Sequence, residues 1–180
     1  MKKILFGIIA LVASTAADAK TLVAYFSRSG NTELVANQIA AATGADTFRI
    51  ETMDENFYPS DYTATTEQAK QEIADGTLPE IKPVPDMSEY DVVFIGSPVW
   101  WGCVATPVKT FLVQNAMTGK TVVPFNTHAG SGTGNVHTDI NEMTAFATAH
   151  LDGIAIVGSD APNSSETVNT WLKQIGQISE

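Results

Sequence analysis

Cysteine is almost absent from this chain of 180 residues, which contains only Cys103. A single thiol cannot form an intramolecular disulfide, so the chain is not a small scaffold held together by disulfides. Its stability must come from a hydrophobic core. We interpret Cys103 as a small buried apolar residue. Its position next to an aromatic loop leaves oxidation or a mixed disulfide as the alternative.

Long hydrophobic runs are also lacking. An apolar run covers residues 4–13, follows a pair of lysines and leads to a small-residue stretch ending at Ala19. It is too short to cross a bilayer, which takes about 20 apolar residues, and its flanks are those of a secretory signal peptide. We therefore assign residues 1–19 to a signal peptide cleaved after Ala19 and residues 20–180 to one folded domain. A retained anchor helix is the alternative.

Neither a twin-arginine pair nor a lipid-anchoring cysteine accompanies the apolar run. We therefore expect unfolded export by the Sec route, to the periplasm or as a secreted protein, with no membrane insertion after signal cleavage. A cofactor would then bind after translocation.

Basic residues are outnumbered two to one. The chain has 10 basic and 20 acidic residues, and removing Lys2, Lys3 and Asp18 with the signal peptide leaves 8 and 19, a net charge of −11. Such a surface repels nucleic acids and anionic lipids, so no nucleic-acid partner is expected. It favours a basic partner protein or serves solubility alone. The remaining 161 residues suit one domain with a single core.

Strand-like and helix-like segments alternate along the chain. Apolar runs bounded by turn residues predict buried strands, and apolar residues at helical spacing predict amphipathic helices. The predicted strands cover residues 21–27, 47–51, 91–96, 121–126 and 153–158. Three predicted helices cover residues 31–43, 63–75 and 106–116. Two more follow the last two strands: one has an apolar stripe of Val136, Ile140, Met143 and Ala147, and the other has a buried face of Val168, Trp171, Leu172 and Ile175. Because parallel strands need crossover connections, this alternation predicts an α/β fold, a three-layer α/β/α sandwich around a five-stranded parallel sheet.

End signals support several of these boundaries. Gly44 is expected to end the first helix in a left-handed conformation. Thr106 followed by Pro107 is typical of a helix N-cap and first turn, and Asn163 three residues before a glutamate resembles a capping signal. Residues 52–88 interrupt the alternation, and we interpret them as one crossover helix with long arms.

The loops after the strands are the first places to look for a site, because ligands of open α/β sheets bind beyond the carboxyl ends of the strands. Ser27-Arg28-Ser29-Gly30-Asn31-Thr32 follows the first strand and leads into a helix. Hydroxyl groups, a glycine and free N–H groups at a helix N-terminus suit a phosphate dianion. An ordinary capped turn is the alternative, because the same residue types are good caps.

Two later loops have complementary chemistry. Gly96-Ser97-Pro98-Val99-Trp100-Trp101-Gly102 places two adjacent tryptophans in a loop. We expect at least one to stack on a planar ligand, while the other packs a helix against the sheet edge. Thr127-His128-Ala129-Gly130-Ser131-Gly132-Thr133-Gly134 is rich in glycine, so its backbone amides could approach the polar edge of a ring. A flexible turn is the alternative.

Other ligands are disfavoured by what the first loop and the histidines lack. The first loop matches neither the G-x-G-x-x-G of dinucleotide binders nor the G-x-x-x-x-G-K-[ST] of P-loop enzymes, which disfavours NAD and ATP. His137 and His150 have no cysteines or carboxylates at ligand spacing, so no metal is expected. We nominate no catalytic acid or base. We interpret Arg28 as pointing to solvent, with partial neutralisation of a bound anion as the alternative.

Taken together, the three loops resemble the flavodoxin family over essentially all of residues 20–180, and Tyr-Pro-x-Asp-Tyr at residues 58–62 resembles its bacterial flavodoxin-like branch. The resemblance implies strand order 2-1-3-4-5 with FMN at the switch point between the first and third strands, which is the arrangement of flavodoxin itself. The candidate cofactor-binding residues are Ser27, Arg28, Ser29, Gly30, Asn31 and Thr32 around the phosphate, and Pro98, Val99, Trp100, Trp101, His128, Ala129, Gly130, Ser131 and Gly132 around the isoalloxazine.

The resemblance implies an exported FMN-binding electron-transfer protein, monomeric or homodimeric, that serves a redox partner protein or a small-molecule electron acceptor. The third loop offers His128 where many flavodoxins place an aromatic side chain, so one flavin face could be open. An open face would suit an FMN-dependent NAD(P)H:quinone-type reductase, the second hypothesis. A flavin-free binding module on the same fold is the third, because a fold does not determine a function.

Overall fold

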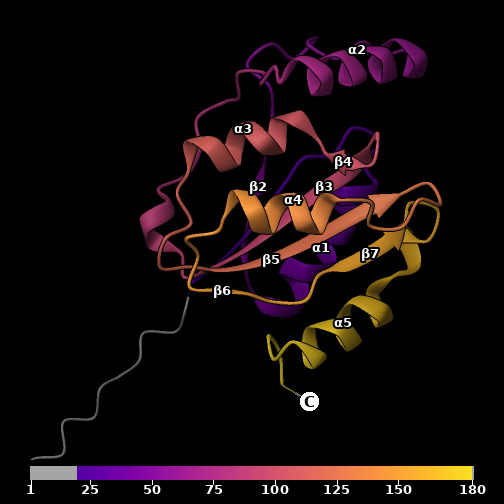
Figure 1. Ribbon diagram of the computed structural model, residues 1–180. Coiled ribbons are helices and arrows are strands. Elements are labelled where there is room, and N and C mark those ends of the chain that lie inside the picture. Colours follow the sequence, from indigo (N-terminus) through magenta and orange to yellow (C-terminus); the bar gives the residue numbers. More distant parts are fainter. Residues whose placement is uncertain (1–19, 180) are drawn as a thin grey trace, which may run out of the picture.

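The computed structural model describes residues 20–179 and contains one parallel sheet between layers of helices (Figure 1). The predicted signal peptide lies outside the described residues. The four main strands are β1 (Thr21–Tyr25), β2 (Asp46–Arg49), β3 (Val92–Trp100) and β5 (Thr121–His128). They pair in the order β2-β1-β3-β5, and all three pairings are parallel.

Two short strands share the edge beyond β5. β6 (Ala149–His150) pairs with the beginning of β5, and β7 (Ile154–Val157) pairs with its end. Taken together as the fifth strand, they complete the order 2-1-3-4-5, so the predicted fold class is confirmed. The strand predicted at residues 153–158 is the second half of this edge, and the sequence did not reveal the first half.

Helices cover both faces of the sheet, as Figure 1 shows. α1 (Asn31–Thr43) and α5 (Ser165–Gln174) lie on one face, and α3 (Thr106–Gln114) and α4 (Val136–Met143) lie on the other. α2 (Tyr62–Asp75) packs outside α3, and two short 3-10 turns, Met87–Glu89 and Ala161–Asn163, complete the helical segments. Of the described helices, none combines the length and apolar character needed to span a bilayer.

Alternate side chains of each strand enter two separate halves of the core. Leu22 and Ala24 of β1 join the half under α3 and α4, and Val23 and Tyr25 join the half under α1 and α5. Because both faces of the sheet are covered, its strands are apolar on both sides. This is why they read as continuous apolar runs in the sequence.

The crossover between β2 and β3 has the predicted form of one helix with long arms. Its two arms run side by side, with an isolated antiparallel bridge between Thr52 and Ile81. The amide of Met53 donates to the carbonyl of Glu80 at 2.9 Å, and the amide of Lys82 donates to the carbonyl of Glu51 at 2.8 Å. The arms therefore hold each other and place α2 over the loops at the carboxyl ends of the strands.

Helix ends agree with the sequence at α1 and at the end of α2, and differ at several other positions. Gly44 ends α1 in a left-handed conformation with φ 70°, as predicted. Thr106 is the first residue of α3 rather than its N-cap, because its hydroxyl donates to the buried carboxylate of Glu72. α3 ends at Gln114, two residues earlier than predicted. Ala147 lies beyond the end of α4, and Asn163 belongs to the 3-10 turn before α5, whose N-cap is Ser164.

His137 on α4 makes the stability of this fold sensitive to pH. Burial lowers the pKa of His137 below its usual 6.5, opposed in part by a hydrogen bond with the backbone of Ile154. The unfolded chain therefore takes up a proton more readily than the folded protein, and the free energy of unfolding falls as the pH drops below 6.5. We expect urea titrations between about pH 7.5 and about pH 5 to show this loss. The His137→Phe variant should lose less, and an equal loss in both proteins would contradict the assignment.

Candidate functional site

The three candidate loops meet at the carboxyl edge of the sheet. The registers place Tyr25 of β1 beside Gly96 of β3, and Pro98 of β3 beside Thr127 of β5. The residues that follow these positions therefore leave three neighbouring strands at one edge. The sequence-based expectation that separate loops form one site is thus supported by the pairing of the strands that carry them.

The first loop leaves the N-terminus of α1 without a side-chain cap. The N-cap residue is Gly30, with φ 91°, and no side-chain cap hydrogen bond is formed within residues 20–179. A helix N-terminus with free N–H groups attracts an anion through these donors and through the helix dipole. This favours the phosphate-site interpretation of the loop over an ordinary capped turn.

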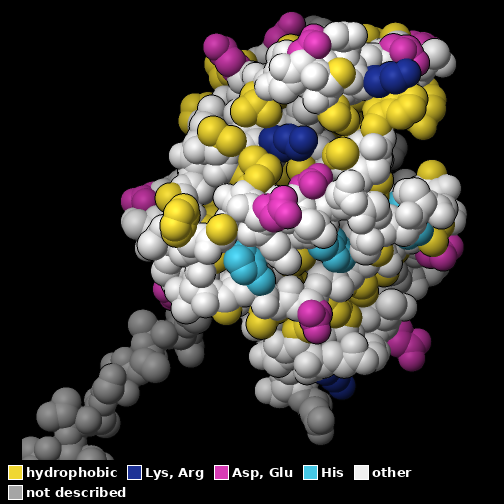
Figure 2. Space-filling view, viewed as in Figure 1, with side chains coloured by type: hydrophobic (Ala, Val, Ile, Leu, Met, Phe, Trp, Pro, Cys, Tyr) yellow, Lys and Arg dark blue, Asp and Glu magenta, His cyan; other side chains and the backbone are white. Residues whose placement is uncertain are grey.

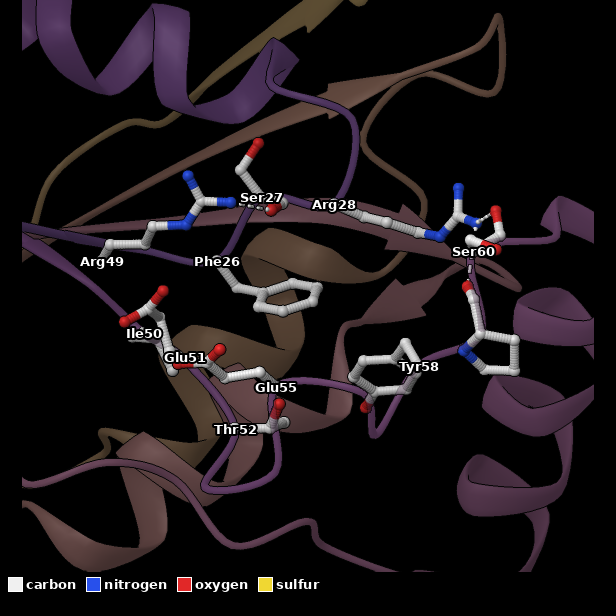
Figure 3. A pocket seen from close by; sticks show the side chains of 11 residues that line it. Phe26, Ser27, Arg28, Arg49, Ile50, Glu51, Thr52, Glu55, Tyr58 and Ser60 are labelled. Carbon is white, nitrogen blue, oxygen red and sulfur yellow. Dashed lines mark hydrogen bonds between the residues drawn. The ribbon is translucent and has the colours of Figure 1, made fainter.

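Ser27 supplies a second polar group at the same place. The residue is 3% exposed, and its hydroxyl oxygen is buried with no hydrogen-bond partner among the described residues. In Figure 3 this hydroxyl points away from Glu51 and Thr52. A buried hydroxyl without a partner is costly, so its presence beside this helix N-terminus suits a hydrogen bond to a ligand oxygen.

Two further residues of the first loop are held by the strands behind it. The Thr32 hydroxyl shares a buried hydrogen bond of 2.8 Å with Thr127 of β5. Asn31 packs so closely on Gly158 that a Cβ at that position would lie 2.5 Å from its Nδ2 atom. The loop is therefore positioned by β5 and by the residue that follows β7.

Arg28 does not point to solvent, contrary to our interpretation of the sequence. Its Nη2 atom donates to the carbonyl oxygens of Ser60 at 3.0 Å and Pro59 at 3.4 Å, as Figure 3 shows. Its guanidinium lies 5.7 Å from the centre of the Tyr62 ring. These partners come from the arm before α2 and from the first residue of α2, so they are too distant in sequence to be foreseen. Arg28 fastens this arm to the first loop.

The charge of Glu33, in the first turn of α1, is compensated by its neighbours. Arg49 forms an ion pair with it at 2.7 Å and also donates to the carbonyl of Ser27 at 3.0 Å. The Tyr25 hydroxyl donates to the same carboxylate at 3.3 Å. Burial, together with the nearby Glu33 charge, raises the pKa of Tyr25 to about 12, so its proton stays in place. This arrangement lowers the repulsion that Glu33 would exert on an anion at α1.

The two tryptophans of the second loop have different environments. Trp100 is half-buried and packs edge-on against Phe26 and Tyr58, at centroid distances of 5.3 and 5.0 Å. Trp101 is 50% exposed, and its indole N–H donates to the carbonyl of Thr66 on α2. The Trp100 ring is thus held in place by aromatic residues that pack against it, and the Trp101 ring contacts the crossover helix α2. Cys103 is half-buried rather than buried, because it sits in β4 (Cys103–Val104), a short strand that folds back on β3.

The third loop is shaped by His128 itself. The backbone amides of Gly130 and Gly132 donate to His128 Nδ1 at 3.0 and 3.1 Å. The side-chain amide of Asn126 donates to the carbonyl of Gly132. These two glycine amides are therefore already engaged, contrary to the expectation that they approach a ligand. The ring accepts through Nδ1, so a neutral His128 carries its proton on Nε2.

A cavity of about 460 Å³, the central cavity, lies among the three loops. Eight of the candidate cofactor-binding residues line it, together with five residues outside that set. The eight candidate residues are Arg28, Ser29, Asn31, Pro98, Val99, Trp100, His128 and Ala129. The five other lining residues are Tyr62, Thr127, Val157, Gly158 and Ser159.

The remaining predicted residues lie outside the central cavity. Ser27 lines the cavity of Figure 3, of about 510 Å³, together with two arginines and two glutamates, Arg28, Arg49, Glu51 and Glu55. Trp101 and Ser131 line a third cavity under α2. The other predicted residues line none of these three cavities in the described part of the chain and shape the loops instead: Gly30, Thr32, Gly130 and Gly132.

One group of missed residues could have been found from the sequence. Gly158 and Ser159 follow the fifth strand, and the rule that sites lie beyond strand ends applies to that strand as well. Tyr62 had no such signal, because it begins α2 and reaches the site only through the crossover. Within residues 20–179, no group of three histidine, cysteine or acidic side chains is placed to hold a metal ion.

Comparison with known proteins places the chain in a family. A family model described as flavodoxin matches residues 20–175. A protein of Bacteroides eggerthii described as a flavoprotein is 32% identical, with 88% of this chain and 98% of that chain covered and a TM-score of 0.76. The search of curated proteins found no match.

Two further solved structures extend this likeness. A flavoprotein of Lactobacillus acidophilus, solved in complex with FMN, is 30% identical, with 85% of this chain and 98% of that chain covered and a TM-score of 0.67. The flavodoxin of Megasphaera elsdenii is 21% identical over 85% of this chain and 98% of its own, with a TM-score of 0.55, and shares the fold. Both the family match and these neighbours are consistent with the α/β fold described above. The chain belongs to the flavodoxin family.

Proposed function

We propose that this chain is an FMN-binding electron-transfer protein. The observation that carries the proposal is the N-terminus of α1, which has no side-chain cap among the described residues and whose neighbours Ser29 and Asn31 line a cavity that is walled by Trp100. The Ser27 hydroxyl, just before this loop, has no partner among the same residues. These groups suit a phosphate at one end and a planar ring at the other. The relative from Lactobacillus acidophilus, solved with FMN, supports the same cofactor.

The residues present fit FMN in their chemistry. The N–H groups of α1, with Ser27, Ser29 and Asn31, would hold the phosphate, and Trp100, Pro98 and His128 would frame the isoalloxazine. When bound, FMN supplies the redox chemistry. The chain binds and orients the cofactor and limits the access of water and of partners to it.

Titrating the purified protein with FMN tests the cofactor. We expect stoichiometric uptake, quenching of flavin fluorescence and a yellow protein. A protein that folds normally and takes up no FMN would be a flavin-free binding module, and the proposal would be wrong.

Rapid mixing and steady-state assays test whether the protein is an electron carrier or an enzyme. Reduced holoprotein should pass electrons to a basic one-electron acceptor such as cytochrome c, since the chain has a net charge of −10. It should show negligible turnover of a quinone with NADH or NADPH. Rapid turnover would identify an NAD(P)H:quinone-type reductase instead.

Export is part of the same proposal. The pattern of residues 1–19 supports a signal peptide cleaved after Ala19, and the protein would then receive FMN outside the cytoplasm. Fractionating cells and sequencing the N-terminus of the protein would test this. A cytoplasmic protein that keeps Met1 would rule it out.

A further inference from the structure

A second cavity adjoins the central one, between α2 and the turn that joins β3 to β4. We call it the outer cavity. Its volume is about 320 Å³, and its lining combines three aromatic rings with small side chains and one cation: Arg28, Tyr62, Thr65, Thr66, Ala69, Val99, Trp100, Trp101, Gly102 and Ser131.

The turn beside this cavity holds Trp101 in an unusual conformation. β3 and β4 pair through Trp100 and Cys103, leaving Trp101 and Gly102 as a two-residue turn with φ values of 50° and 82°. Turns of this kind favour asparagine and glycine, and a bulky residue with positive φ is strained. A strained residue in a cavity wall is a reason to look for a function there.

Contacts with α2 fix the Trp101 indole. Its N–H donates to the carbonyl of Thr66 at 2.9 Å, and Lys70 lies 4.8 Å from the centre of the ring. Figure 2 shows apolar side chains beside a basic one at this corner of the molecule, next to α2. The indole therefore forms a fixed aromatic wall even though half of its surface is exposed.

The charge of the outer cavity is opposite to that of the chain. Arg28 is the only charged residue among the described residues that line it, in a chain with twice as many acidic as basic residues. Both hydrogen bonds of Arg28 use Nη2, so the N–H groups of Nη1 and Nε have no partner in residues 20–179. These donors suit an anionic or carbonyl oxygen, and the rings beside them suit a flat aromatic body.

The outer and central cavities share a wall but not a phosphate site. Arg28, Tyr62 and Trp100 line both of them. Ser29 and Asn31, at the N-terminus of α1, line only the central cavity. A molecule in the outer cavity would thus lie next to the ring end of a cofactor without competing for its phosphate site.

We propose that the outer cavity binds a planar aromatic electron acceptor that carries an anionic oxygen, next to FMN. This inference rests on the proposed function, because it names the small-molecule acceptor of the same site. The aromatic walls bind the ring system, and Arg28 selects the charge.

Calorimetric titration of the FMN-loaded protein with 1,4-naphthoquinone-2-sulfonate tests this directly, without any turnover. We expect saturable binding that weakens with added salt, and weaker binding of the uncharged 1,4-naphthoquinone. The Thr66→Leu variant fills the cavity with a larger side chain and should weaken binding of the sulfonate about tenfold, which is about 1.4 kcal/mol. Thr63→Leu is the matched control, because Thr63 is exposed on the same helix and does not line the cavity.

The following results of these titrations would overturn the proposal or part of it. No saturable binding, or equal binding by Thr66→Leu and wild type, would overturn the proposal. Equal affinities for the charged and uncharged quinones would overturn the role of Arg28. If Thr66→Leu weakens FMN binding as strongly as quinone binding, the outer cavity is part of the cofactor site and the proposal is wrong. Failure of the wild type to bind FMN is a separate result, which overturns the proposed function.

Discussion

Replacing Ser29 with glutamate is expected to weaken FMN binding by about a hundredfold or more, while leaving the apoprotein at least as stable as the wild type. Ser29 is exposed and lines the central cavity next to the uncapped N-terminus of α1. A carboxylate there occupies the place of a phosphate, and juxtaposed like charges cost several kcal/mol, with each 1.4 kcal/mol worth a factor of ten. The same carboxylate stabilises the helix dipole by about 0.3–1 kcal/mol.

The opposite signs of these two effects make the prediction specific. Fluorescence titration gives the FMN affinity, and urea unfolding of the apoprotein gives the stability. Ser29→Gln is the matched control, because it has a similar size and no charge, and it should lose no more than about tenfold in affinity. Unchanged FMN affinity in Ser29→Glu would show that the phosphate binds elsewhere. A destabilised apoprotein would instead point to a loop that cannot accept a larger side chain.

The sequence predicted this site at the level of loops and strand ends. The residues after β1, β3 and β5 could be recognised because the carboxyl ends of parallel strands share one edge, and each loop had suitable chemistry. Which atoms are free could not be predicted. His128 engages the amides of Gly130 and Gly132, and Thr32 bonds to Thr127, because these pairings depend on how the loops fold against each other.

Contacts made through the crossover were the least predictable part of the site. Arg28 and Tyr62 are 34 positions apart, and their contact exists only because the arms around α2 pair with each other. The antiparallel turn at Trp101 was also missed. Its central residues are Trp101 and Gly102, whereas the usual sequence signal for such a turn is asparagine followed by glycine.

Most of the fold was predictable because strands buried on both faces have a simple pattern. The five strand positions agree with the structure, as does the strand order that the resemblance to flavodoxins implies, whereas the ends of helices agree less well. Thr106 illustrates the reason. Its type and its neighbour Pro107 are typical of an N-cap, but a buried partner on another helix engages its hydroxyl instead. A local signal was overridden by a contact that no local pattern contains.

That partner is Glu72, a buried carboxylate between α2 and α3. It is 5% exposed and has no ion pair with a described basic residue. It accepts from the hydroxyls of Tyr58 and Thr106, and from the side-chain amide of Gln68 at 3.0 Å. Burial raises the pKa of Tyr58 well above its usual value, so the phenol remains a donor. Three neutral donors therefore hold this charge in place of a cation.

Replacing Glu72 with alanine is expected to lower the free energy of unfolding by about 3 kcal/mol or more, because it leaves buried donors without an acceptor and creates a cavity. Glu72→Gln keeps the shape, and the hydroxyls of Tyr58 and Thr106 can accept as well as donate. It should lose only about 1 kcal/mol. Urea unfolding of both variants checks the difference. Equal losses would mean that the charge of Glu72, rather than its hydrogen bonds, stabilises the contact between α2 and α3.

Loss of the Glu72 carboxylate should also affect the site, because the Tyr58 hydroxyl donates to it and the centre of the Tyr58 ring lies 5.0 Å from that of Trp100. Trp100 lines both the central and the outer cavity, and α2 supplies one side of the latter. In Glu72→Ala we therefore expect the near-ultraviolet circular dichroism of the tryptophans to change under native conditions, together with a weaker FMN affinity. Glu72→Gln should keep both. A destabilised Glu72→Ala protein with unchanged dichroism and affinity would show that the hydrogen bonds of Glu72 fasten α2 without positioning the aromatic wall.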